Sequence, residues 1–288
     1  MIRKNSILIG ILFLSTECLA FGHVDLRGDD LVLLPGAPII LKAKLSKAYA
    51  FFENTLSNKT VEFYHEGSLL GTSQTDRRGE STFSVSEALP NGQHEIVLRT
   101  KIDKKNYESE VLIQILDSTS AIGLLDIDDT ISRTDKSELM RGDYKASPPL
   151  PGAVAALSEL SESFQLLYLT ARDDNFKNST RSWLECFKFV PAPVFVDSWK
   201  VGFSGIKFPN ARAYKSKKIA SIMNTHPNIA FGVGDKESDA LAYDDHSILP
   251  IIISDRSSTG ASSKFPEATI FVTKWKEALR VIKKGHRN

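Results

Sequence analysis

The sequence predicts two domains, an all-β sandwich followed by an α/β domain with a Rossmann-like parallel sheet. Residues 24–117 contain short runs in which apolar and polar side chains alternate with period 2, separated by turn residues. Residues 120–288 instead alternate near-continuous apolar runs with helical patterns, which is typical of parallel strands covered on both faces. The chain has 288 residues, of which 42% are hydrophobic and 25% charged, so both domains can build a core.

The first 20 residues have the pattern of a secretory signal peptide. Arg3 and Lys4 form a positive start, an apolar run follows from Ile7 to Leu14, and Cys18-Leu19-Ala20 supplies a cleavage sequence. A lipoprotein anchor at Cys18 is the less favoured alternative, because Glu17 before it is not a small residue. Later apolar runs fall short of the roughly 18 residues of a membrane helix. We therefore expect an exported protein, periplasmic or secreted.

Composition argues against several other classes of protein. Removal of the signal peptide would leave Cys186 as the only cysteine, so no disulfide within the chain is expected. Its neighbours, Trp183 to Phe187, resemble an apolar helix face, and we expect Cys186 to pack rather than react. The six His residues lack the paired spacing of a zinc site, and the formal net charge of +1 does not predict nucleic-acid binding.

The β-type runs of residues 24–117 suit an immunoglobulin-like (Ig-like) domain, which contains roughly 100 residues. Thr75 to Phe83 is similar to the Thr-Asp-x-x-Gly hairpin of exported bacterial Ig-like modules. In this turn Gly79 would supply a positive φ, and Phe83 would point inward. We see no catalytic cluster in this half and expect a spacer or adhesion module. The runs cover residues 39–43, 60–64, 81–85, 95–98 and 110–115.

The α/β half is predicted from four buried-strand runs and one helical segment. In parallel sheets of this kind, ligands bind beyond the carboxyl ends of the strands. The side chains that follow each strand are therefore the candidates for a functional site. The strand runs cover residues 121–125, 166–169, 229–233 and 249–253, and the helical segment covers 153–157.

Acidic residues follow two of these strands. Asp126 and Asp128 come after the first strand, Thr170 after the second, and Asp235 and Asp239 after a later one. Carboxylates beside buried strands are costly unless a cation or a proton neutralises them, and oxygen ligands are those that Mg²⁺ prefers. A threonine hydroxyl and a lysine at the same edge would suit a phosphate group. Ordinary acidic helix caps are the alternative, less favoured because four acids lie at equivalent strand ends.

Taken in order, these residues resemble the motifs of the haloacid dehalogenase (HAD) superfamily of phosphatases. The pattern is Asp126-x-Asp128-x-Thr130, Thr170, a downstream Lys, and Gly234-Asp235-x-x-x-Asp239, within residues 120–270. Residues 126–131 are similar to the start of the actin-patch phosphatidate phosphatase domain. Residues 151–154, 169–174, 181–184 and 231–243 are similar to the related domain of lipins and phosphatidylinositol-transfer proteins.

The chain also departs from these relatives. Lipins tend to carry Asn where this chain has Asp235, and the actin-patch family differs after its last motif aspartate. The resemblance therefore specifies the chemistry more closely than the substrate.

The resemblance implies a role for each motif residue. Asp126 would be the nucleophile that forms an aspartyl-phosphate, and Asp128 would protonate the leaving alkoxide and then activate water, for which it needs a raised pKa. Thr170 and Lys215 would hold the transferred phosphoryl oxygens. Mg²⁺ would be required because carboxylate and phosphate are both anions. The implied metal ligands are Asp126, Asp128 through its backbone carbonyl, and Asp235, with Asp239 a ligand or an orienting partner of Lys215. The implied substrate-binding residues are Thr130, Thr170, Arg172 and Lys215.

Lys215 is one of four nearby lysines, and the local pattern selects it. Family members carry an apolar or aromatic residue, then the lysine, then a helix with an aliphatic residue at the fourth position, as Tyr214-Lys215 to Ile219 does. Lys217 and Lys218 would then lie on the helix surface, and Lys207 is the second candidate. Arg172 would either contact the substrate or form a structural ion pair.

The short spacings from Thr130 to Thr170 and from Thr170 to Lys215 leave little chain for a large cap. A site without one would admit bulky substrates, such as a lipid headgroup. We predict a Mg²⁺-dependent phosphatase acting on a phosphate monoester, with phosphatidate as the candidate. The alternatives are a phosphatidate-binding module without catalysis and an adhesion protein with a vestigial enzyme. Oligomeric state is not specified.

The C-terminal stretch from residue 274 to 288 is rich in Lys and Arg, with Trp275, Leu279 and Ile282 near one helix face. We expect this helix to pack its apolar face on the sheet. Peripheral contact of its basic face with an anionic membrane is the alternative.

Overall fold

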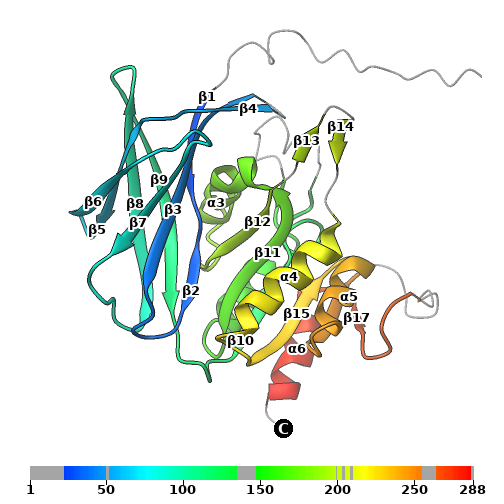
Figure 1. The fold of residues 1–288 in the computed structure, drawn as a ribbon. Helices are drawn as coiled ribbons and strands as arrows, with labels where there is room; N and C mark the ends of the chain where they lie inside the picture. Colours follow the sequence, from blue (N-terminus) through cyan, green and yellow to red (C-terminus); the bar gives the residue numbers. More distant parts are fainter. Residues whose placement is uncertain are drawn as a thin grey trace, which may run out of the picture.

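A computed structural model describes residues 23–49, 52–134, 147–198, 200–202, 205–207, 210–254 and 264–286. The predicted signal peptide, residues 1–20, lies outside these ranges. Figure 1 shows β-strands forming the N-terminal half and a sheet flanked by helices forming the C-terminal half. Within the described ranges, no helix has the length and apolar character needed to cross a membrane.

Two sheets form the N-terminal half. In the first, β3 (Ile39–Tyr49) pairs antiparallel with β1 (His23–Gly28), β4 (Phe52–Thr55) and β7 (Glu80–Val85). The second has the order β2-β9-β8-β5-β6, with β2 parallel to β9 and the other neighbours antiparallel. Its strands are β2 (Leu31–Leu33), β5 (Thr60–His65), β6 (Ser68–Gln74), β8 (Gly92–Ile102) and β9 (Lys105–Ile115).

One apolar core lies between these two sheets, so this half is a β-sandwich. Leu41 and Leu45 of β3 belong to the same buried cluster as Phe63 of β5 and Leu98 of β8. Phe63 stacks on Phe83 with the ring centroids 5.0 Å apart, so the predicted inward position of Phe83 is confirmed.

The turn before β7 has the predicted backbone conformation. Gly79 has a φ of 72°, and a Cβ at this position would lie 2.4 Å from the carbonyl oxygen of Leu45. Asp76 closes the turn, because its Oδ1 accepts hydrogen bonds from the backbone N–H groups of Arg78 and Glu80. Only glycine combines this φ with such a close approach of backbone.

The C-terminal half contains a six-stranded parallel sheet with the order β12-β11-β10-β15-β16-β17. The predicted α/β class with a parallel sheet is therefore confirmed. The short edge strands β12 and β17 were not predicted, because runs of three or four residues give little periodicity. The strands are β10 (Ile122–Leu125), β11 (Gln165–Asp173), β12 (Val194–Asp197), β15 (Ile229–Gly234), β16 (Leu249–Ile253) and β17 (Ile270–Val272).

Helices cover both faces of this sheet (Figure 1). On one face Leu157, Trp183 and Trp275 join a single buried cluster. On the other face Ile219 and Tyr243 do the same. Burial on both faces explains why the strands read as continuous apolar runs. The helices are α2 (Ala153–Leu160), α3 (Lys177–Cys186) and α6 (Trp275–His286) on the first face, and α4 (Ala211–Met223) and α5 (Glu237–Asp244) on the second.

The amphipathic helix α6 packs on the sheet as predicted. Trp275, Ala278 and Ile282 are buried in the core, whereas the basic residues Lys276 and Arg280 are exposed. The packing of its apolar face is thus confirmed, and its contact with a membrane stays a prediction.

Cys186 is exposed, so the expectation that it packs in the core is wrong. The buried side of α3 is formed by residues 177, 180, 181, 183 and 184. Residue 186 lies about 200° around the helix from residue 184, at roughly 100° per residue. Residue 186 therefore lies on the opposite side from most of the buried residues, and of its apolar neighbours only Trp183, about 60° away around the helix, is close to it.

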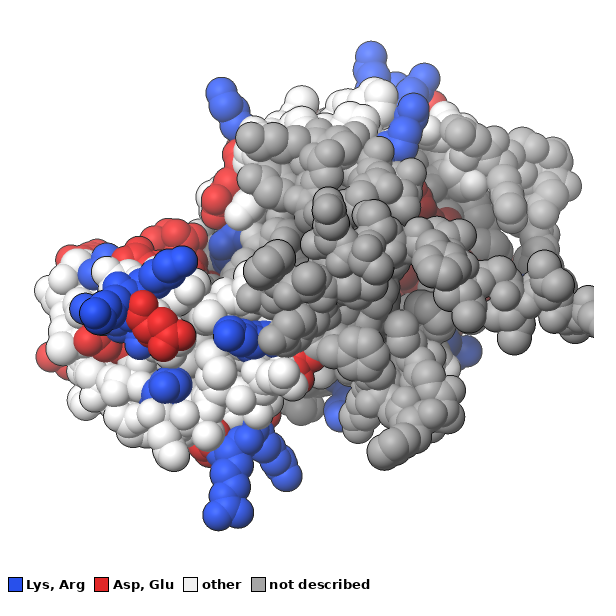
Figure 2. All heavy atoms as spheres, turned by 90° about the horizontal axis from the view of Figure 1, so that it is seen from above, with Lys and Arg blue, Asp and Glu red and all other residues white. Residues whose placement is uncertain are grey.

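A small hairpin, β13 (Lys200–Gly202) and β14 (Gly205–Lys207), connects β12 to α4 and was not predicted. Between β11, which carries Thr170, and α4, which carries Lys215, the described elements are a 3-10 turn (Asp174–Phe176), α3, β12 and this hairpin. Residues 135–146, which follow the Asp126 loop, lie outside the described ranges. Figure 2 shows acidic and basic side chains interspersed on the described part of the face seen there.

Candidate active site

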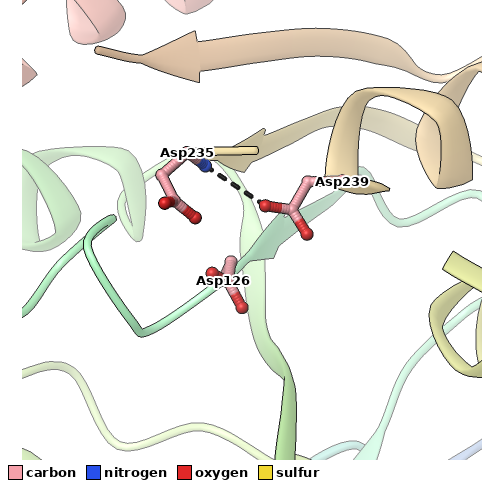
Figure 3. Close-up of side chains that lie close together, drawn as sticks. All are labelled: Asp126, Asp235 and Asp239. Carbon is pink, nitrogen blue, oxygen red and sulfur yellow. Dashed lines mark hydrogen bonds between the residues drawn. The ribbon is translucent and has the colours of Figure 1, made fainter. Parts of the chain in front are cut away.

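Three aspartates converge at the carboxyl edge of the parallel sheet. Asp126 follows the central strand β10, Asp235 follows its neighbour β15, and Asp239 lies in the first turn of α5. Each offers a carboxylate oxygen within 4.8 Å of the other two (Figure 3). The parallel register of β10 and β15 places both strand ends at the same level, which is why residues over 100 positions apart meet here.

Lys215 of α4 lies between two of these carboxylates. Its side chain is 2% exposed, and its Nζ donates to Asp126 Oδ1 and to Asp239 Oδ1, both at 2.6 Å. Burial alone would lower the pKa of Lys215, but the two carboxylates outweigh it and raise the pKa well above its ordinary value. Lys215 therefore remains charged, and among the described residues it is the buried lysine that contacts these carboxylates.

Asp239 is engaged through both of its oxygens. Its Oδ2 accepts from the backbone N–H groups of Asp235 and Lys236, each at 3.2 Å, and its Oδ1 accepts from Lys215. Burial opposes ionisation of Asp239, but Lys215 and these N–H groups lower its pKa. Of the two roles expected for Asp239, this arrangement favours the orientation of Lys215.

Gly234 makes the approach of Asp239 to the strand end sterically feasible. A Cβ at position 234 would lie 2.5 Å from the Asp239 Cβ and 2.6 Å from its Oδ2. Such contacts are far inside van der Waals distance, so a larger residue would force α5 away from β15.

Asp126 and Asp235 carry charge that the protein only partly compensates. Burial raises the pKa of Asp126 to about 7 despite the charge of Lys215, and burial raises the pKa of Asp235 to about 6 despite Lys236. Lys236 Nζ lies 2.9 Å from Asp235 Oδ2 but is half exposed. A cluster of buried carboxylate oxygens with this excess of negative character fits a hard divalent cation such as Mg²⁺.

Asp128 lies beside the cluster, and its carboxylate is bound by Arg172 from the end of β11. Arg172 Nη2 donates to Asp128 Oδ1 at 2.8 Å, and Nε donates to Oδ2 at 3.0 Å. Burial favours the neutral acid, but the charge and hydrogen bonds of Arg172 lower the pKa of Asp128 to about 2. The expected raised pKa is therefore wrong for this structure. Of the two roles left open for Arg172, the structure shows the ion pair.

The two motif threonines are buried and contact the aspartates. Thr170 Oγ1 donates to Asp128 Oδ2 at 3.4 Å and accepts from the backbone N–H of Arg172 at 3.3 Å. Thr130 is 0% exposed, with its Oγ1 3.4 Å from Asp126 Oδ2. Thr130 is therefore placed to orient Asp126, and the substrate contact expected for it stays a prediction.

The structure thus brings Asp126, Asp128, Thr170, Lys215 and the Asp235–Asp239 pair to one edge of the sheet. The carboxylates that could together hold a cation are those of Asp126, Asp235 and Asp239, whereas the Asp128 carboxylate faces Arg172. The side chain of Lys207, the second lysine candidate, lies outside the described residues.

Three contacts at the site were not predicted from the sequence. Lys236 forms an ion pair with Asp235, and its position beside that aspartate was the available signal. Trp275 of α6 donates from Nε1 to the carbonyl oxygen of Thr130 at 2.8 Å, which fixes the loop from the far end of the chain. Thr180 accepts a hydrogen bond from Arg172 Nη1 at 2.9 Å, and nothing in the sequence marks it.

Comparisons with known proteins agree with this geometry. Residues 123–247 match the family described as phosphatidate phosphatase APP1, catalytic domain, a stretch that contains every motif residue from Asp126 to Asp239. This match identifies a phosphatase domain. No curated protein sequence matches the chain.

Solved structures similar to this chain include HAD-like hydrolases. A haloacid dehalogenase-like hydrolase from Streptococcus pneumoniae is 19% identical, with 57% of this chain and 98% of that chain covered and a TM-score of 0.40. A protein described as a predicted phosphatase from Clostridium acetobutylicum is 16% identical, with coverages of 58% and 99% and a TM-score of 0.43. A chimeric titin Z1Z2 structure is also similar, at 12% identity, with 33% of this chain and 96% of that chain covered and a TM-score of 0.25.

Proposed function

We propose that residues 123–247, which match the family described as phosphatidate phosphatase APP1, catalytic domain, form a Mg²⁺-dependent phosphomonoesterase that acts through an aspartyl-phosphate. The observation that supports this proposal most directly is the position of the buried Asp126 beside Asp235. Lys215 contacts one of its carboxylate oxygens, and Thr130 contacts the other. A carboxylate so fixed at a strand end is placed to act as a nucleophile.

Asp126, Asp235 and the backbone carbonyl of Asp128 would hold the metal ion, as the resemblance implies. When bound, Mg²⁺ supplies positive charge that lets a carboxylate and a phosphate dianion approach each other. The raised pKa values of Asp126 and Asp235 support this assignment, because they indicate that the carboxylates lack sufficient positive partners.

In the first half-reaction an Asp126 oxygen attacks phosphorus, and the bond from phosphorus to the ester oxygen breaks. The leaving alkoxide takes the proton of the Asp128 carboxyl group, which becomes a carboxylate. Lys215 stabilises the phosphoryl oxygens as charge develops on them, and Thr170 is placed at the same edge.

In the second half-reaction the Asp128 carboxylate takes a proton from water, and the hydroxide formed attacks the phosphorus of the aspartyl-phosphate. The bond from phosphorus to Asp126 breaks, and inorganic phosphate leaves. Arg172 keeps Asp128 in the carboxylate form that this step requires. For the first step, the negative charge of a bound phosphate raises the pKa of a nearby carboxyl group and so favours the protonated form.

The substrate class we propose is a phosphate monoester of a lipid, with phosphatidate as the specific candidate. The family description supports this choice, because it names phosphatidate phosphatase. A site without a large cap would admit a lipid headgroup, and the exposed basic residues of α6 would suit an anionic membrane surface. We further propose that the chain is exported after cleavage of its signal peptide and that the β-sandwich is Ig-like.

The test uses the purified mature protein with dioleoyl phosphatidate in detergent micelles and with p-nitrophenyl phosphate, each with Mg²⁺ or with EDTA. We expect phosphate release that requires Mg²⁺ and is abolished in Asp126→Asn. Asp129→Asn is the matched control, because Asp129 is half exposed and has a φ of 59° that Asn tolerates. The ratio of the two substrates tests the lipid preference.

Detection of the covalent aspartyl-phosphate complements the measurement of phosphate release. Acid-quenched enzyme should carry a phosphoryl group on the peptide that contains Asp126, detectable by mass spectrometry. Binding of phosphatidate vesicles without release of phosphate from either substrate would instead indicate the non-catalytic lipid-binding module and refute the proposal.

A further inference from the structure

Asp30 joins the β-sandwich to the phosphatase domain through a set of buried contacts. It lies between β1 and β2, and its side chain is 0% exposed. Both of its oxygens accept from Arg181 Nη2 of α3, at 2.8 and 2.7 Å, and Oδ1 lies 3.2 Å from Lys177 Nζ. Because charges are almost never buried without such pairing, Asp30 and helix α3 are fixed relative to each other.

The same aspartate also fixes one strand of each domain. Its Oδ1 accepts from the backbone N–H of Leu112 in β9 at 3.0 Å, and its Oδ2 accepts from the backbone N–H of Val194 in β12 at 2.7 Å. Backbone donors cannot rotate away as side chains can. These bonds therefore set the register of the sandwich against the edge of the parallel sheet.

Other contacts from the sandwich reach the same helix. Asn178 Nδ2 donates to Asp25 Oδ1 at 2.9 Å and to the carbonyl oxygen of Leu26 at 2.8 Å. Asn178 Oδ1 accepts from Ser109 Oγ at 2.9 Å, and Lys177 Nζ donates to the carbonyl oxygen of Gly28. The first turn of α3 is therefore held by the sandwich on several sides.

The loop that leads into α3 is held in the same way. Arg27 of β1 is buried and paired with Asp25, and its Nη2 donates to Asp174 Oδ2 at 3.2 Å. Asp174 comes two residues after Arg172 in the chain. The sandwich thus contacts the chain immediately beyond the end of β11 and the helix that follows it.

Helix α3 transmits this position to the active site through Thr180. Thr180 is 0% exposed, and its Oγ1 accepts from Arg172 Nη1 at 2.9 Å. Arg172 in turn holds both oxygens of Asp128. A continuous series of contacts therefore runs from Asp30 through α3 to the proposed acid–base residue.

We propose that the β-sandwich is a positioning element of the phosphatase site, in which Asp30 and Asn178 fix α3 so that Thr180 and Arg172 hold Asp128 for proton transfer. The inference rests on the proposed function and adds a role for the N-terminal half, for which the sequence predicted a spacer or adhesion module. It assigns no substrate contact to the sandwich.

The test separates positioning of Asp128 from a general loss of structure by comparing two leaving groups. Phenyl phosphate and p-nitrophenyl phosphate differ only in the nitro group, but the p-nitrophenolate leaves readily without a proton, whereas the phenolate depends more on the acid. Full-length mature Asp30→Asn and Asn178→Ala are assayed on both esters with Mg²⁺. Asn178→Ala removes hydrogen bonds but no charged group and is the variant to use where Asp30→Asn does not fold.

We expect kcat/KM for phenyl phosphate to fall about tenfold or more in these variants, and kcat/KM for p-nitrophenyl phosphate to fall by less than about threefold. This ratio reports the steps up to release of the phenol, so hydrolysis of the aspartyl-phosphate, which also uses Asp128, does not enter it. Thr100→Val is the matched control, because Thr100 is a buried sandwich residue whose hydroxyl donates to the carbonyl oxygen of Thr60, within the sandwich itself. It should leave the ratio of the two rates unchanged.

A second measurement distinguishes this inference from the proposed function. Amide hydrogen exchange of the peptide covering residues 165–181 should be faster in Asn178→Ala than in the wild type and unchanged in Thr100→Val. If the wild type hydrolyses neither ester, the proposed function fails, and unchanged exchange would then also overturn the positioning. If the wild type is active and kcat/KM falls equally for the two esters in Asn178→Ala, the positioning alone is refuted.

Discussion

Replacement of Lys215 by methionine is the most direct test of how the active site balances its charge. The side chain keeps most of its length and volume but loses the ammonium group. That group lies 2.6 Å from Asp126 Oδ1 and 2.6 Å from Asp239 Oδ1, and all three side chains are nearly inaccessible to solvent. The variant therefore leaves two buried carboxylates without their shared cation.

Removal of one partner from a buried ion pair costs about 3–5 kcal/mol. For a domain of this size, that corresponds to a fall in Tm of roughly 6–20 °C. The pKa of Asp126 is already raised to about 7, above the value of about 3.9 for an unfolded chain, so the folded state binds more protons and stability falls as pH rises between these values. Loss of Lys215 raises this pKa further, and the deficit should therefore be larger at pH 8 than at pH 5.5.

Thermal unfolding of the metal-free protein at pH 5.5 and pH 8 measures this effect, with Lys217→Met as the matched control on the exposed side of α4. Phosphate release from p-nitrophenyl phosphate should fall about 10²- to 10³-fold in Lys215→Met, because a stabiliser of transition-state charge is lost. A Tm within about 2 °C of the control at pH 8, or an equal deficit at both pH values, would refute the view that Lys215 balances the charge of these carboxylates.

Three further outcomes are expected. Mg²⁺ affinity measured by titration calorimetry should increase from pH 5.5 to pH 8, because Asp126 and Asp235, with pKa values of about 7 and 6, must lose protons to bind a cation. A Mg²⁺ affinity that does not change with pH would contradict this. Gly234→Ala should lower Tm and reduce kcat at least tenfold, since the alanine Cβ would lie 2.5 Å from the Cβ of Asp239. A wild-type rate would show that α5 can shift without loss of activity. Asp128→Asn should accumulate aspartyl-phosphate with p-nitrophenyl phosphate as substrate, because the base that activates water is lost, and mass spectrometry would detect the phosphorylated enzyme. Turnover at the wild-type rate would exclude Asp128 as the base.

The parallel sheet and the site edge could be predicted from the sequence because their signals are local. Asp126, Asp128 and Asp235 each follow a strand closely, and strand ends in a parallel sheet lie at one edge. Lys215 could be placed because an aromatic residue precedes it and a helix follows. These inferences need only the order of elements along the chain.

The electrostatic state of Asp128 could not be predicted in the same way. Its pKa depends on whether Arg172 turns toward it or toward the substrate, and that choice is set by Thr180, a residue eight positions further along. The burial of Thr130 likewise depends on Trp275, which arrives from the last helix of the chain. Such contacts link distant segments through single side chains and leave no periodic pattern in the sequence.

The buried charges between the two halves bear on what the sandwich does. A buried ion pair contributes little net stability, because desolvation of the charges offsets their attraction, and an apolar contact of similar volume would serve stability equally well. Asp30, Lys177 and Arg181 instead provide directional bonds, and Asp30 adds two to backbone N–H groups of different domains. Directional bonds fix a position that apolar packing leaves adjustable. Since α3 holds Arg172, and Arg172 holds Asp128, the geometry that these charges fix is that of proton transfer at the active site.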